Sequence, residues 1–203
     1  GLFSDPTKGE YQSLAIGAKF TDLRHVPTLW KTPAETDCSA FPARRGYADL
    51  LSLFSVPAAE LKGSPAWVTA TNTEAGYVWF AFKDAEVLPT TVFWIENHGR
   101  HGSPWNGRNN CLGVEDVCAF FADGLAPSIK PNIVNEAGIP TSVELSKSKP
   151  TAINYIQGVA RIPAGFEQVR TVEFSAGQAT FVSTTGAKVT IAVKHEFLRS
   201  GSL

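Results

Sequence analysis

AWVTATNTEAGYVWFAFKD, residues 66–84, decides the fold class of this chain. Two short runs rich in β-branched and aromatic residues flank TNTEAG, and Pro, Gly and Asp bound them. Such runs are typical of strands, and a short connection containing Gly is typical of a hairpin. The stretch therefore predicts two antiparallel strands.

The same pattern extends along the chain on both sides of this stretch. Further strands are expected in TVFWIEN (91–97), INYIQGVARIP (153–163), FEQVRTVEFS (166–175), ATFVSTT (179–185) and KVTIAVKHEFL (188–198), with hairpin turns at SAGQ and TGAK. Residues 1–65 are rich in Pro and Gly, and YADLLSLFSV (47–56) fits either a short helix or a buried strand. The spacing predicts an all-β antiparallel fold with few short helices, as one β-sandwich domain over 1–203, loop-rich over 1–65 and strand-rich over 66–203.

Composition narrows the class of protein. The chain has 203 residues, 18% of them charged, and a formal net charge of -1. Scattered Lys and Arg argue against a nucleic-acid partner, and no apolar stretch is long enough to cross a bilayer. Three irregularly spaced cysteines and the lack of a signal-peptide pattern predict buried thiols in a reducing, cytoplasmic compartment. Because the chain contains no Met and starts GLFSDPTKG, we expect a processed product or a fragment.

The polar run ENHGRHGSPWNGRNNCLGVEDVCAFFADG, residues 96–124, is the candidate functional segment. Its polar groups would lose free energy if they were buried without partners, so the run suits a cleft that binds a hydroxyl-rich ligand. Asp116–Asp123 fits one or two helical turns, capped by Asp116 and ended by Gly124; alternatively, Asp116 continues the strand of Glu115 and its side chain points to the other face.

His98 and His101 have two functional interpretations in HGRH. They could contact a polar ligand or, with Glu96, hold a metal; the lack of a third ligand at a familiar spacing argues against a metal site. A solvated loop is the structural alternative.

Trp105 follows a proline and precedes Asn106, Gly107 and Arg108. It is either a tryptophan packed on a turn or an apolar platform for a sugar ring. Aromatic and basic residues together also suit base stacking, but the chain lacks an extended basic face.

Glu115 lies in the apolar run CLGVEDV. In a cleft, partial burial would raise its pKa and make it a better general base; the alternative is an exposed carboxylate at a sheet edge.

The stretch WIENHGRHGSPWNGRNNCLGVEDVCAFFADG (94–124) resembles the later half of the aldose 1-epimerase (galactose mutarotase)-like family. In that family a Trp-containing polar segment leads to a strand that ends in the catalytic glutamate, written CLEP or CIEP. NCLGVED stands there in this chain, so the resemblance assigns the base to Glu115. Asp116 replaces the usual proline, the family's upstream histidine motif is absent, and the chain is shorter than typical members.

The resemblance implies an antiparallel β-supersandwich that interconverts the anomers of a sugar or sugar phosphate by acid/base ring opening, without a cofactor or a metal. The acid would be a histidine outside this chain, or His98 or His101. Arg100, Trp105, Asn106 and Arg108 would bind the substrate. The alternatives are a non-catalytic carbohydrate-binding β-sandwich and a structural or interaction β-sandwich whose polar run is an ordered loop.

Overall fold

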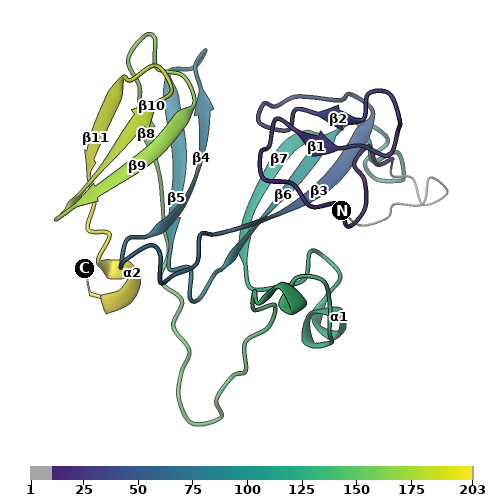
Figure 1. Ribbon diagram of the computed structural model, residues 1–203. Coiled ribbons are helices and arrows are strands. Elements are labelled where there is room, and N and C mark those ends of the chain that lie inside the picture. The colour runs from purple at the N-terminus through teal and green to yellow at the C-terminus, as the bar shows by residue number, and fades with distance from the viewer. Residues whose placement is uncertain (1–10, 203) are drawn as a thin grey trace. The chain divides into compact units, whose positions relative to one another are not determined.

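The computed structural model describes residues 11–202 and consists mainly of antiparallel strands with few short helices, which confirms the predicted all-β class (Figure 1). The strands are β1 (Val26–Pro27), β2 (Glu35–Thr36), β3 (Tyr47–Phe54), β4 (Ala66–Asn72), β5 (Tyr77–Lys83), β6 (Thr90–Asn97), β7 (Asn110–Val117), β8 (Ile156–Arg161), β9 (Val169–Ser175), β10 (Gln178–Ser183) and β11 (Lys188–Ala192). The helices are α1 (Leu125–Ile129), α2 (Phe197–Ser200) and the 3-10 turn η2 (Asn135–Ala137). Among residues 11–202, no helix has the length and apolar character needed to cross a membrane.

The chain divides into two compact units. The single β-sandwich domain over 1–203 stays a prediction. Unit 1 contains described residues 11–54 and 90–143, and unit 2 contains 55–89 and 144–202. Because the chain crosses between the units three times, neither unit is one continuous segment. Runs of similar strand-like sequence carry no local signal of such a division.

Unit 1 contains a three-stranded antiparallel sheet in the order β3-β6-β7. The segment 47–56, which fitted a helix or a strand, forms β3 and pairs along its whole length with β6. Seven of the eight residues of β6 are buried, as expected for a central strand. The short pair β1-β2 lies in the same unit.

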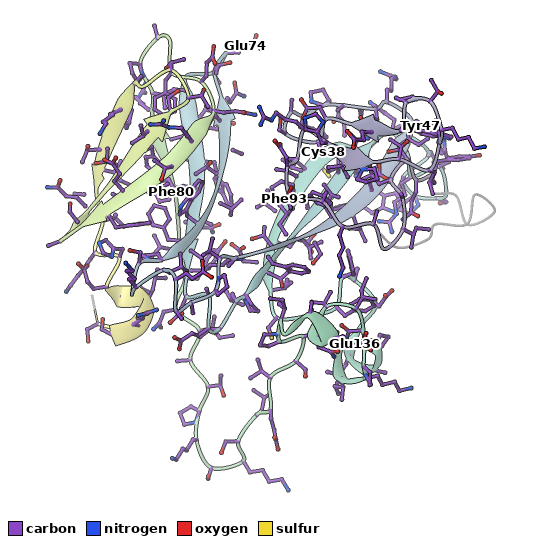
Figure 2. The ribbon with its side chains drawn as sticks, in the orientation of Figure 1. Cys38, Tyr47, Glu74, Phe80, Phe93 and Glu136 are labelled. Atoms are coloured by element: carbon purple, nitrogen blue, oxygen red, sulfur yellow. The ribbon has the colours of Figure 1, made fainter. Side chains whose placement is uncertain are left out.

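Unit 2 contains two three-stranded antiparallel sheets, β4-β5-β8 and β11-β10-β9, whose buried side chains form one core. Phe80 on β5 lies 4.8 Å from Phe82 and 5.1 Å from Phe181 between ring centroids, and it points between the two sheets in Figure 2. Each such ring stabilises the unit by roughly 1.5–3 kcal/mol relative to an exposed position. In β10, Ala179 and Phe181 lie two residues apart on one face of the strand, are both buried and belong to this core.

The three hairpins predicted from TNTEAG, SAGQ and TGAK are confirmed between β4 and β5, β9 and β10, and β10 and β11. The helical turns predicted for 116–123 are wrong. Asp116 belongs to β7, where it pairs with Thr91 and accepts a hydrogen bond of 2.5 Å from the Thr91 hydroxyl. Gly124, at φ 87°, precedes helix α1 and does not end one, so cross-strand pairing overrides the local capping signal.

Candidate functional site

Strands β6 and β7 and the loop that joins them position the candidate site on unit 1. The register places Trp94 opposite Gly113 and Val92 opposite Glu115. Directly opposed residues of an antiparallel pair have their side chains on the same face. Trp94, Gly113 and Glu115 therefore share one face of the sheet.

Arg100 lies between two tryptophans and forms the tryptophan–arginine cluster, which consists of Trp94, Arg100 and Trp105. The Arg100 guanidinium carbon is 5.5 Å from the ring centroid of Trp94 and 5.1 Å from that of Trp105. The two indoles meet edge to face with centroids 6.1 Å apart. Both arrangements attract a cation or a ring edge to the electron-rich face of an indole. Trp105 nevertheless keeps 37% of its surface exposed, so the cluster presents an aromatic surface to solvent.

Glu115 is an exposed carboxylate on the edge strand β7, beside Trp94. A methyl group built on Gly113 would lie 3.0 Å from Glu115 Oε1 and 3.1 Å from Trp94 Cβ. The missing side chain of Gly113 thus lets the carboxylate and the indole lie close together above the sheet. Glu115 extends the cluster by one acidic group.

The loop 98–109 is held by its own backbone and by strand β3. His98 N–H donates to the Asn109 carbonyl at 2.9 Å, and Gly107 N–H donates to the Arg100 carbonyl at 2.9 Å. Gly99 lies so close to β3 that a Cβ there would be 2.1 Å from the Ala48 nitrogen. Only glycine fits this position, and Arg100 follows directly after it.

The two histidines have local partners in this loop. His98 is half-buried, and its Nδ1 lies 2.8 Å from the Gly107 carbonyl oxygen. His101 is exposed and packs edge to face against Tyr11, with ring centroids 4.8 Å apart. Both residues lie in the loop that carries the cluster, but no contact between their rings and the cluster is described.

The remaining predicted residues lie on the exposed side of the same loop. Asn106 adopts a left-handed φ of 51°, and its N–H donates to the Gly102 carbonyl at 3.1 Å. Arg108 is exposed and donates to the Pro104 carbonyl at 3.4 Å. The structure therefore brings Arg100 and Trp105 into direct contact and places Asn106 and Arg108 on their loop.

Sequence reasoning missed Trp94 and the structural role of Glu96. Trp94 was interpreted as an ordinary strand residue, although Gly113 in the next strand was a signal of close approach. Glu96 is fully buried, and its Oε1 accepts a hydrogen bond from the Arg100 backbone N–H at 3.2 Å. Among residues 11–202, no group of three or more His, Cys, Asp or Glu side chains is arranged to hold a metal ion.

The three cysteines are free thiols in this structure. Burial raises the pKa of Cys38, an effect that the nearby Arg44 guanidinium partly offsets. Burial also raises the pKa of the half-buried Cys118. Both thiols therefore carry less reactive thiolate at neutral pH than an exposed cysteine.

Comparisons of the chain with models of protein families, with curated proteins and with solved structures found no match. The aldose 1-epimerase-like assignment consequently remains a prediction based on residues 94–124, and the geometry of the cluster is the basis for a functional proposal.

Proposed function

We propose that unit 1 binds a carbohydrate on the tryptophan–arginine cluster. The observation that carries this proposal is the exposed indole of Trp105, which contacts Arg100 and packs edge to face with Trp94. Sugar rings have apolar C–H faces, which suit an aromatic surface, and polar rims, which suit neighbouring hydrogen-bonding groups. Asn106, Arg108 and Glu115 supply such groups around the cluster.

The test of carbohydrate binding replaces one exposed tryptophan at a time. Trp105→Ala is expected to weaken binding of a sugar at least about tenfold, because it removes the platform. Trp30→Ala is the matched control, since Trp30 is also in unit 1 and 39% exposed, and its ring packs edge to face on Tyr47, which is not a residue of the cluster. Saturation-transfer NMR with a panel of neutral, acidic and phosphorylated monosaccharides measures the contact.

Each result of this comparison has a defined meaning. The proposal is supported if saturation transfer to a sugar is lost in Trp105→Ala and kept in Trp30→Ala. Absence of transfer from the wild-type protein to every sugar contradicts it and favours a structural or interaction role. Equal effects of the two variants would assign binding to another surface.

Anomer interconversion is a second and more specific candidate function. The observation that favours it is the exposed Glu115 carboxylate on the same sheet face as Trp94, within reach of a ligand on the cluster. In this reaction Glu115 would take the proton of the anomeric hydroxyl, and an acid would protonate the ring oxygen as the bond from that oxygen to the anomeric carbon breaks. Rotation about the C1–C2 bond and reversal of both proton transfers give the other anomer.

The acid in this candidate mechanism is His98 or His101, or a group supplied from outside the described residues. Ring N–H groups suit proton donation near neutral pH. His98 is half-buried and its Nδ1 contacts the Gly107 carbonyl, which leaves only Nε2 for a ligand, whereas His101 is exposed. His101 is therefore the better of the two candidates.

Glu115→Gln tests the catalytic role separately from binding. Because a positioned general base contributes about 10²–10⁴-fold, the substitution should reduce anomer exchange at least about 100-fold while sugar contact remains. Polarimetry of freshly dissolved α-glucose and α-galactose measures the exchange. Glu35→Gln, an exposed glutamate of unit 1 that pairs with His25, is the control and should leave the rate unchanged.

If the wild-type protein does not accelerate anomer exchange of either sugar, catalysis on those sugars is refuted. The proposed binding function is not affected by that result. Accelerated exchange that survives Glu115→Gln would show that another group is the base.

A further inference from the structure

A groove of about 610 Å³ lies in unit 1 along strand β3. Five consecutive strand residues, 50–54, form one wall. The segment 14–23 and side chains such as Phe121, Ile133 and Val134 complete the lining, which is mostly apolar. Trp105, Arg100 and Glu115 are not among the lining residues, so this groove is separate from the tryptophan–arginine cluster.

Strand β3 is an edge strand, and its backbone explains what the groove can bind. Ser55 N–H, directly after β3, donates to the Pro89 carbonyl at 2.9 Å, while Ala48 N–H donates away from the sheet to the Tyr11 carbonyl at 2.7 Å. Hydrogen-bonding direction alternates along an antiparallel strand. The N–H and C=O groups of Leu50, Ser52 and Phe54 therefore point away from β6, at the free edge of the sheet where β3 lines the groove.

Ser52 and Lys19 are two of the polar side chains that line the groove. Ser52 Oγ is buried and has no hydrogen-bond partner in the described part of the chain. A buried hydroxyl without a partner costs free energy that a bound polar group would recover. Of the described residues that line the groove, only Lys19 is charged; Glu136 shares with it a smaller adjoining hollow.

We propose that the groove binds an extended peptide segment that adds a strand to β3. The peptide has apolar side chains at alternate positions, which enter the groove, and an acidic residue that faces Lys19. Its backbone pairs with the outward N–H and C=O groups of Leu50, Ser52 and Phe54. An aliphatic lipid chain would match the apolar lining but would leave these backbone groups without partners.

The test uses a fluorescein-labelled synthetic peptide, Glu-Val-Thr-Val-Thr-Val, and two derivatives N-methylated at alternate residues of opposite parity. N-methylation removes backbone donors and keeps the side chains. In strand addition only one parity faces β3, so one derivative should bind like the parent peptide and the other should not bind. Fluorescence anisotropy against the full chain measures all three peptides.

Variants of the protein test the contribution of strand β3 to peptide binding. Ser52→Pro removes an outward N–H at an edge-strand position that tolerates proline, and it should weaken peptide binding at least about fivefold. Phe54→Asp places a charge on a groove residue that is 47% exposed and should also weaken binding. Circular dichroism verifies the fold of both variants, and their contact with sugars should be unchanged.

Three results would overturn the proposal. The first is no binding of the parent peptide up to about 1 mM, the affinity of a very weak complex. The second is an equal effect of the two methylation patterns. The third is displacement of the peptide by dodecanoate micelles but not by unlabelled peptide, which would identify a site for aliphatic chains.

Discussion

A single buried carboxylate, that of Asp49, joins the segment before β1 to strand β3. It accepts hydrogen bonds from the backbone N–H groups of Ser13 and Leu14 at 2.8 and 3.1 Å and from the Ser13 hydroxyl at 2.5 Å. Arg44 Nε lies 3.6 Å from the same carboxylate, and both side chains are almost completely buried. Removing one partner of such a pair leaves the other charge in a medium that solvates it poorly.

Asp49→Asn is expected to reduce the free energy of unfolding by about 3 kcal/mol, because the Arg44 charge stays buried without its counter-ion. Asp22→Asn is the matched control in unit 1. Its ion pair with Arg24 is exposed, so its loss should leave the free energy of unfolding nearly unchanged. Urea unfolding measured by tryptophan fluorescence compares them, and equal effects would contradict the importance of burial.

At the scale of elements, two glycines in strands make room for an aromatic side chain of the neighbouring strand. Gly113 on β7 makes room for Trp94, and Gly158 on β8 lies opposite Phe80 in the register of β5 and β8. A Cβ on Gly158 would be 2.7 Å from Phe80 Cζ. Phe80 is packed in the core of unit 2 and has little freedom to move away.

Gly158→Ala should therefore lower the free energy of unfolding by about 1–3 kcal/mol, the usual cost of overpacking a core. Val159→Ala, in the same strand, truncates a side chain that is 63% exposed. It should change the free energy of unfolding by less than about 0.5 kcal/mol. Urea unfolding followed by circular dichroism measures both. Wild-type stability of Gly158→Ala would mean that the Phe80 ring is not confined.

At the scale of the whole molecule, the two units differ in chemistry. Unit 2 is built around one aromatic and aliphatic core between its sheets. Unit 1 contains the tryptophan–arginine cluster, the buried Asp49 and the groove along β3. The two proposed binding activities therefore both belong to unit 1, and each is tested by variants that leave unit 2 unchanged.

Local sequence predicted the strands well because their signals are local. Alternation of side chains and flanking Gly, Pro and Asp residues located β4 to β6 and β8 to β11. The same signals failed at Asp116 and Gly124, because a capping residue and a strand residue can have the same identity. Pairing with Thr91, 25 residues earlier in the chain, decided the structure there.

The candidate site likewise depends partly on local sequence and partly on contacts between distant segments. The sequence by itself determined the all-β class and drew attention to Arg100, Trp105 and Glu115, because polar and aromatic residues in one loop are visible without a fold. Only the tertiary structure shows that Trp94 contacts Arg100, that His98 Nδ1 lies beside the Gly107 carbonyl and that a groove runs along β3. Each of these depends on strand register and on segments distant in the chain, which short-range periodicity does not encode.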